Sequence, residues 1–398
     1  MQRGSTKEHT SRSMARVRRV AVCATAVVAT VFAATACTPP TAATGVDPNT
    51  APRADEPAYA TAGPYDVGVT TIELSDRPME VWYPVQPGTA DGKPFDEYHI
   101  RGFVSSFFDG LLDPSVDPVF TTTAVRDVPV ADGGPFPLVL FAHGFASFRL
   151  QSSNLTAHLA SWGFVVISPD FLDRGLRSVL GEPPAVQRSD LDVADEAINT
   201  IRSASTSPDG RFSGKVDVTR VFPVGHSAGG ATAVALLARP DVPSAIPLAS
   251  GYLVSAAIAG KLDLDLSKPV MWIGGTRDGI VPLDDIRNGF EWTSGERRLV
   301  EIDSGHLNGF SDICAIGDGG VVALARASSL PIPEFLLQLG NDGCEVPPNV
   351  PSQELWPVVN HFVTAELRYR SELDPEPVGL GSGVQASLPH VLRYLHNP

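Results

Sequence analysis

The sequence predicts an α/β fold in which a mostly parallel sheet of about eight strands is flanked by helices. Continuous apolar runs at 137–142 and 163–170 are typical of strands that are buried on both faces of a sheet. Helical patterns at 151–162 and 190–203 alternate with these runs, and such alternation favours parallel β-α-β units. A sharp strand–turn–helix junction at 221–238 is the most distinctive stretch of the chain.

Length and composition narrow the class of protein. The chain has 398 residues, of which 43% are hydrophobic and 19% are charged, and this is enough for a large core. The net charge of −15 argues against nucleic acid as a partner and against electrostatic docking on anionic lipid. We expect one catalytic domain over residues 63–398.

The first 36 residues are typical of a bacterial secretory signal. Arginines between Arg12 and Arg19 precede the uncharged run 20–36, which gives a basic segment followed by an apolar one. This run is short for a permanent membrane span. The interpretation as a signal peptide predicts an exported protein, although an uncleaved anchor and a twin-arginine signal stay open as alternatives.

Cys37 follows a run of small residues, Ala34-Thr35-Ala36. Small residues directly before a cysteine are typical of a lipoprotein signal, in which the cysteine becomes the lipid-modified first residue. Leucine is the usual residue where Ala34 stands, so plain secretion stays open beside a membrane tether through Cys37. Residues 37–62 are small, polar and rich in proline, and they predict a flexible tether.

Two of the four cysteines remain for the exported domain. Cys23 lies in the apolar run and Cys37 is the candidate lipidation site, which leaves Cys314 and Cys344. An even pair in an exported domain predicts a disulfide, and a loop of about 30 residues would gain about 3–4 kcal/mol from it. Two unrelated buried thiols are the alternative.

The remaining elements follow from local patterns. A hairpin is expected at the start, and three further stretches are expected to be strands, of which the last is expected to be the final strand of the sheet. A short helix fits residues 103–112, and residues 356–370 predict the final helix. The hairpin strands and the three further strands are expected at 70–74, 79–83, 245–249, 269–274 and 297–302.

The junction at 221–238 holds a Gly-x-Ser-x-Gly motif. Gly225 and Gly229 bracket Ser227 between an apolar strand and an alanine-rich helix. Glycines are needed in so sharp a turn because side chains there would collide with neighbouring backbone. This context is that of an exposed nucleophilic serine. The alternative is a turn of small residues packed only for space.

A serine hydroxyl needs a base, and the base needs an orienting acid. In junctions of this kind the acid and then a histidine follow the serine along the chain. Asp278 stands just past the apolar run 269–274, and His306 stands after the run 297–302. We therefore expect Ser227, Asp278 and His306 to be catalytic. The alternatives lie nearby or downstream: Asp284, Asp285, His361, His390 and His396.

The oxyanion of an acyl-transfer reaction needs backbone donors. Ala228 follows the serine at a helix N-terminus, and Phe145 stands in the loop after the strand 137–142. We expect their N–H groups to form the oxyanion hole and the Phe145 ring to line the acyl pocket. His143 and His226 are expected to be structural.

With these residues in place, the chain resembles serine hydrolases of the alpha/beta-hydrolase superfamily. In particular it resembles bacterial platelet-activating-factor acetylhydrolase and dienelactone-hydrolase-like proteins. The resemblance spans about residues 63–310 and implies the alpha/beta-hydrolase fold. It is carried by Gly63–Gly68 with Val81–Pro84, by His143–Phe145, by Gly225–Gly229 and by Ser304–His306.

The resemblance implies a carboxylic ester hydrolase that forms a covalent acyl-enzyme on a small-molecule or lipid ester. Dienelactone hydrolases use cysteine where Ser227 stands, so lactone opening is not implied. A phospholipase-type, platelet-activating-factor-acetylhydrolase-like or polyester substrate is an alternative, although polyester hydrolases usually have methionine where Ala228 stands. A binding lipoprotein without catalysis is another. The sequence shows no metal-ligand cluster, phosphate loop or dinucleotide motif, so we expect neither a metal nor a cofactor; it leaves the oligomeric state open.

Overall fold

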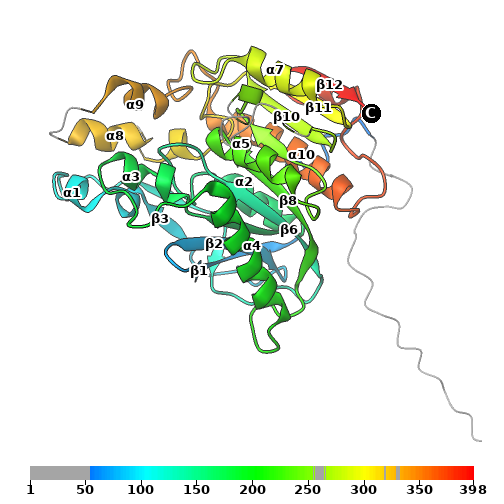
Figure 1. The fold of residues 1–398 in the computed structure, drawn as a ribbon, viewed down its shortest axis with the longest axis horizontal. Coiled ribbons are helices and arrows are strands. Elements are labelled where there is room, and N and C mark those ends of the chain that lie inside the picture. Colours follow the sequence, from blue (N-terminus) through cyan, green and yellow to red (C-terminus); the bar gives the residue numbers. More distant parts are fainter. Residues whose placement is uncertain (1–53, 254, 256–263, 265, 318–319, 329–331) are drawn as a thin grey trace, which may run out of the picture. The chain divides into compact units, whose positions relative to one another are not determined.

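The computed structural model describes residues 54–398, apart from 254, 256–263, 265, 318–319 and 329–331. These residues belong to one compact unit built around a ten-stranded sheet with the order β12-β11-β10-β9-β8-β6-β7-β2-β1-β5 (Figure 1). A separate pair joins β3 and β4. The strands are β1 Asp66–Glu73, β2 Pro78–Val85, β3 Glu97–His99, β4 Val119–Thr121, β5 Val125–Arg126, β6 Phe136–Ala142, β7 Val165–Pro169, β8 Val216–His226, β9 Ile246–Leu248, β10 Val270–Gly275, β11 Arg297–Ile302 and β12 Val391–Asn397.

The middle of the sheet is parallel, as the alternating pattern predicted. The strands from β7 through β6, β8, β9 and β10 to β11 pair in parallel. The hairpin of β1 and β2 is antiparallel and joins β7 in the antiparallel sense, and β12 does the same beside β11. The carboxyl ends of the parallel strands therefore share one edge of the sheet, where loops can meet.

Helices cover both faces of the sheet. Residues of α2 and α10 pack with one set of strand side chains, and residues of α4, α5 and α7 pack with the other set. None of the described helices is long and apolar enough to cross a membrane. The α-helices are α1 Ser106–Asp109, α2 Ser153–Ser161, α3 Leu176–Val179, α4 Asp190–Thr206, α5 Ala228–Ala235, α7 Leu283–Trp292, α8 Gly320–Ala327, α9 Glu334–Leu339, α10 Ser352–Arg370 and α11 Val384–Ser387.

Strand β6 shows why the apolar runs are continuous. Val139 and Phe141 point into the core under α2 and α10, whereas Leu138 and Leu140 point into the core under α4 and α5. All four side chains are fully buried, because successive residues of a strand face opposite sides of the sheet. A strand covered on both faces thus needs an apolar residue at every position.

The sheet is larger than the expected size of about eight strands, and the expectation that 297–302 is its final strand was wrong. The sheet has ten strands, and β12 lies beyond the helix that was taken as the last. Its pattern hid it, since an edge strand is half solvated: Leu392 is 54% exposed and Arg393 is polar, whereas Val391 and Tyr394 are buried. The other strand that was not predicted, β5, has only two residues and gives no periodic signal.

The tether expected over residues 37–62 ends earlier in the structure. Tyr59 is buried, its N–H donates to His361 Nδ1 at 3.2 Å, and its hydroxyl donates to Asp374. The N–H groups of Gly381 and Gly383 donate to the carbonyl of Ala54 and the carboxylate of Asp55. Residues 54–62 are therefore part of the folded unit, because an aromatic side chain and several backbone bonds fix them. Residues 1–53, with Cys37, lie outside the described residues.

Candidate functional site

Ser227 stands at the sharp turn between β8 and α5. Its backbone has φ 55° and ψ −122°, a conformation that costs a residue with a side chain about 1–3 kcal/mol. The Ser227 N–H donates to the carbonyl of Leu248 in β9 at 2.8 Å, and this hydrogen bond ties the turn to the neighbouring strand. The strained backbone places the serine beyond the end of β8, at the first step into the helix.

The two motif glycines are required by close backbone contacts. A Cβ at Gly225 would lie 2.1 Å from the carbonyl oxygen of Gly229, and a Cβ at Gly229 would lie 2.0 Å from that of Ala142. Neither site has room for a side chain. The N-terminal turn of α5 can therefore pack directly on the ends of β8 and β6.

The site lies where the strand order reverses. From β6 the chain crosses to β7 on one side and then returns to β8 on the other side. A crevice forms at such a switch point beyond the carboxyl ends of the strands. The loop after β6 and the turn after β8 are adjacent there, and a pocket is lined by Gly144, Phe145, Ser227 and His306.

Asp278 follows β10 and has both carboxylate oxygens engaged. Oδ1 accepts the N–H groups of Ile280 and Val281, each at 2.8 Å, and Oδ2 lies 2.8 Å from Nδ1 of His306. The Asp278 side chain is fully buried. Its loop thus fixes the carboxylate with two backbone donors and aims the second oxygen at the imidazole.

His306 comes from the loop after β11, the strand that pairs in parallel with β10. Since the Asp278 carboxylate is an acceptor, Nδ1 of His306 carries the hydrogen and Nε2 presents a lone pair. Nε2 is buried and has no hydrogen-bond partner among the described residues. A ring nitrogen of this kind, lining the same pocket as Ser227, can accept a proton.

The alternative acids and bases are engaged elsewhere. Asp284 is exposed and pairs with Arg287, and Asp285 accepts the N–H of Leu253. His361 binds the segment before β1, while two further histidines have glutamate partners, His390 with Glu354 and His396 with Glu296. Of the histidines considered, the structure brings only His306 to Asp278 and the pocket.

The loop after β6 is fixed by His143. The N–H of Phe171 donates to its Nε2 at 2.9 Å, so Nδ1 carries the hydrogen and donates to the carbonyl of Gly144 at 2.9 Å. Burial holds the pKa of His143 well below its ordinary value, which keeps the ring neutral. These hydrogen bonds fit the structural role expected for His143, and Phe145, 43% exposed, follows it at the pocket.

A buried hydrogen-bond chain joins this loop to the serine turn between β8 and α5, which we call the elbow. It continues to the loop after β11 that holds His306. The N–H of Gly144 donates to Gln151 Oε1 at 2.9 Å, Gln151 Nε2 donates to His226 Nδ1 at 2.7 Å, and His226 Nε2 donates to the carbonyl of His306 at 2.9 Å. Every donor in this chain has one acceptor. This hydrogen-bond chain therefore links three loops, which fits the structural role expected for His226.

The neutral state of His226 is part of this arrangement. Burial, and then the neighbouring His306, hold the pKa of His226 well below its ordinary value. Protonation of Nδ1 would place a second donor opposite the amide of Gln151. The chain thus has one pattern of donors and acceptors, and it is the one in which His226 is uncharged.

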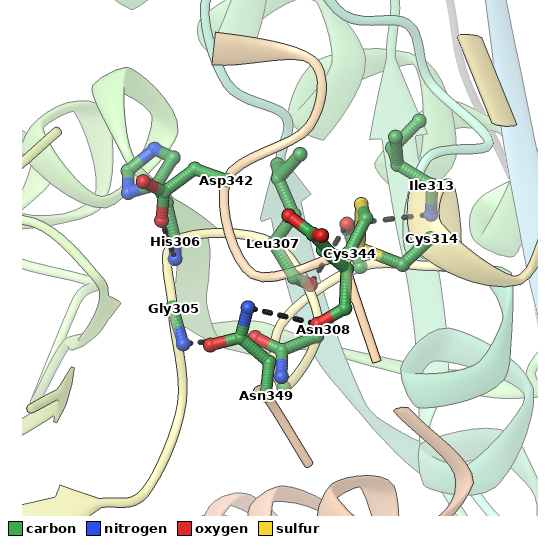
Figure 2. Close-up of a disulfide and its surroundings, with 12 residues drawn as sticks. Gly305, His306, Leu307, Asn308, Ile313, Cys314, Asp342, Cys344 and Asn349 are labelled. Atoms are coloured by element: carbon green, nitrogen blue, oxygen red, sulfur yellow. Dashed lines mark hydrogen bonds between the residues drawn. A yellow bond between two sulfur atoms is a disulfide. The ribbon is translucent and has the colours of Figure 1, made fainter. Parts of the chain in front are cut away.

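The predicted disulfide between Cys314 and Cys344 is present and braces His306 (Figure 2). Two residues before Cys344, Asp342 Oδ1 accepts the N–H of His306 at 2.6 Å, while Oδ2 accepts the N–H of Gly279 at 3.2 Å. One carboxylate thus links the loop of the candidate base to the loop of the candidate acid.

Gln151 and Asp342 are the two site residues that sequence reasoning missed. Gln151 stands near the N-terminus of α2, where it reads as an ordinary polar residue. Asp342 is 36 residues from His306, so no local spacing relates them. The only sequence signal was its place beside Cys344 in a loop whose other end, at Cys314, lies close to His306.

Within the described ranges, no three His, Cys, Asp or Glu side chains gather in a way that could hold a metal ion. The polar side chains that line the pocket are those of Ser147, Gln151, His226, Ser227 and His306.

Comparison with known proteins supports the fold and the class of site. The chlorophyllase family matches residues 118–250, a stretch that includes the loop after β6 and the elbow and ends before Asp278. The chain is also 31% identical over 151 residues to bis(hydroxyethyl) terephthalate hydrolase of Streptomyces coelicolor (strain ATCC BAA-471 / A3(2) / M145).

That alignment covers 38% of this chain and 42% of the relative, so the chain spans about two fifths of the relative's length. Both similarities agree with the observed parallel sheet, its switch point and the serine turn after β8. The chain is therefore an alpha/beta-hydrolase-fold protein whose central part matches the chlorophyllase family.

Proposed function

We propose that this protein is a carboxylic ester hydrolase with Ser227 as nucleophile, His306 as base and Asp278 as the acid that orients it. The observation that carries the proposal is the His306 ring. Its Nδ1 is held by Asp278 at 2.8 Å, and its Nε2 is buried without a partner among the described residues, at a pocket that Ser227 also lines. The fold, the match to the chlorophyllase family and the similarity to bis(hydroxyethyl) terephthalate hydrolase support ester hydrolysis.

The reaction follows from these positions. His306 Nε2 takes the proton of Ser227 Oγ as the oxygen attacks the ester carbonyl, and a tetrahedral oxyanion forms. The C–O bond to the alcohol then breaks, and His306 returns its proton to the leaving alkoxide. A water molecule, deprotonated by the same nitrogen, attacks the acyl-enzyme and releases the carboxylic acid and the free serine. Asp278 stabilises the imidazolium in both steps.

We propose the N–H groups of Ala228 and Phe145 as donors to the oxyanion. Ala228 is the first residue of α5, where backbone N–H groups have no partner within the helix. Phe145 follows Gly144, which the hydrogen-bond chain of Gln151 and His226 ties to the elbow. One donor from the elbow and one from the loop after β6 is the arrangement that such a serine turn requires.

The triad is tested by single substitutions with matched controls. Ser227→Ala, His306→Asn and Asp278→Asn should each lower kcat for p-nitrophenyl acetate by about 10³-fold or more, and Ser227→Ala should lose labelling by a fluorophosphonate probe. Asp284→Asn and His390→Asn remove the exposed alternatives and should keep wild-type rates. If Ser227→Ala kept wild-type activity and an unchanged melting temperature, Ser227 would not be the nucleophile.

A hydroxyalkyl diester is the second candidate substrate. The observation that favours it is the 31% identity to bis(hydroxyethyl) terephthalate hydrolase, and it outweighs the expectation that a polyester hydrolase has methionine where Ala228 stands. The measurement is release of terephthalate monoester from bis(hydroxyethyl) terephthalate by the wild type and by Ser227→Ala. No release by the wild type would remove this substrate.

We propose that the protein is exported, either lipid-anchored at Cys37 or secreted. The disulfide between Cys314 and Cys344 supports an oxidising compartment. Mass spectrometry of the mature N-terminus in a bacterial expression host distinguishes the forms: a lipid-modified Cys37 or an unmodified cleaved chain supports export. A chain that keeps residues 1–36 and stays in the cytoplasm contradicts it.

A further inference from the structure

The pocket at Ser227 extends beyond the serine turn and the loops that carry Phe145 and His306, and its outer walls come from three further parts of the chain. Val104 and Phe108, from the stretch around α1, form one wall. Leu176 and Leu180, from α3 and the residue after it, form the second. These elements lie together at one end of the unit, beside α8 and α9 (Figure 1).

The third wall belongs to the segment that the disulfide closes, from Cys314 to Cys344. Leu324 of α8 and Leu336 of α9 line the pocket, and Ile313 lines it directly before Cys314. Leu324 is only 1% exposed, although α8 and α9 are short helices that lie outside the sheet layers. Val322 and Leu324 of α8 are thus buried at the pocket, whereas Leu336, Leu337 and Leu339 of α9 line it while only partly buried.

The chemistry of the walls is aliphatic and uncharged. Apart from Phe108 and Phe145, the hydrophobic side chains that line the pocket are those of valine, leucine, isoleucine and alanine, and no described Asp, Glu, Lys or Arg lines it. Phe145 lies in the loop after β6, which is proposed to supply one oxyanion donor. A flat aromatic ring gains most from aromatic partners at defined angles, whereas branched aliphatic walls fit a flexible hydrocarbon chain.

We propose that the pocket binds the aliphatic chain of an uncharged ester, and that the segment from Cys314 to Cys344 sets how long that chain can be. This inference rests on the proposed ester hydrolysis and names its substrate class. It separates this protein from its terephthalate-cleaving relative, since it predicts that bis(2-hydroxyethyl) adipate, the open-chain counterpart, is cleaved faster than bis(hydroxyethyl) terephthalate.

The test uses two ester series with the full-length wild type, because the chain can lie on either side of the scissile bond. One series extends the acyl group of p-nitrophenyl esters from acetate to decanoate, and the other extends the alcohol of n-alkyl acetates. In one series kcat/KM should rise by about threefold to fourfold for each buried methylene group until the pocket is full.

Leu336→Trp narrows the pocket from the disulfide-closed segment. It should lower the ratio of kcat/KM for the decanoyl or decyl ester to that for the acetyl or methyl ester by at least about tenfold. Phe335→Trp, at an exposed position on the same helix, is the matched control and should keep the wild-type ratio.

The outcomes separate the inference from the proposed function. Turnover of short esters with no gain in either series, an unchanged ratio in Leu336→Trp, or faster cleavage of the terephthalate than of the adipate overturns the inference alone. No turnover of any ester by the wild type overturns the proposed function and the inference with it.

Discussion

Asp342 shows how a residue outside the proposed triad can fix the positions of two of its members. Its two carboxylate oxygens accept N–H groups from His306 and Gly279, and its carbonyl accepts the N–H of Leu307. Gly279 directly follows Asp278. A single side chain therefore holds the loops of the proposed acid and base at a fixed distance, without touching the pocket where substrate would bind.

We expect Asp342→Ala to lower kcat by about tenfold to a hundredfold with little change in KM. Two charge-assisted hydrogen bonds are lost, each contributing about 1.5–3 kcal/mol, and the His306 ring loses the alignment they impose. Steady-state kinetics on p-nitrophenyl acetate measure this. Glu345→Ala, at the exposed position directly after Cys344, is the control; a wild-type kcat in Asp342→Ala would show that the backbone alone aligns His306.

Among the elements, the sheet core was the part most open to prediction. β6, β7, β10 and the second half of β8 are buried on both faces, so each gives an apolar run. β11 is also largely buried but carries Arg298 and Glu301 within it. The serine turn and the candidate acid and base could be predicted because each follows a predicted strand. The backbone brings these residues together. The parallel strands end at one edge of the sheet, and the two motif glycines allow α5 to pack closely on it.

The elements that were missed give weak or non-local signals. β12 alternates only partly because it lies at the edge, and residues 54–62 are fixed by distant partners such as His361 and Asp374. Gln151 and Asp342 act through hydrogen bonds to backbone far along the chain. No pattern in a single sequence reports a contact of that kind.

The disulfide-closed segment gives a prediction at this scale. Replacing Cys314 and Cys344 by serine should lower the free energy of unfolding by about 3–4 kcal/mol, as the chain-entropy account gives for a loop of about 30 residues. Urea unfolding followed by circular dichroism measures it. Adding reductant to the wild type should reproduce the loss and should leave the double variant unchanged; equal stability of both proteins under oxidising conditions would contradict it.

For the molecule as a whole, buried neutral histidines make stability depend on pH. Burial lowers the pKa of His158 and of His361 to about 4, and it holds those of His143 and His226 well below the ordinary value. Between pH 6.5 and about 4 the unfolded chain binds protons that the folded chain does not, so stability falls as pH falls. Asp312 acts in the opposite direction, because burial raises its pKa to about 8.

His361→Gln isolates one of these contributions. Glutamine can accept the N–H of Tyr59 and donate to the carbonyl of Gly379, as His361 does, but it does not titrate. Each such histidine costs about 1.4 kcal/mol per pH unit, so the variant should lose about 2–3 kcal/mol less stability than the wild type between pH 6.5 and 4.5. Urea unfolding at several pH values compares the slopes, and equal slopes would show that His361 is not the titrating group.

The position of Asp342 inside the disulfide-closed segment also bears on protein engineering. The walls contributed by α8 and α9 could be exchanged for those of a related protein to alter which esters the proposed site accepts, since the proposed nucleophile, base and acid all lie outside residues 314–344. Such a graft would carry away the carboxylate that aligns His306. A transplanted segment therefore has to supply an aspartate at position 342, and a chimera designed on pocket shape alone would inherit a new specificity together with a misaligned base.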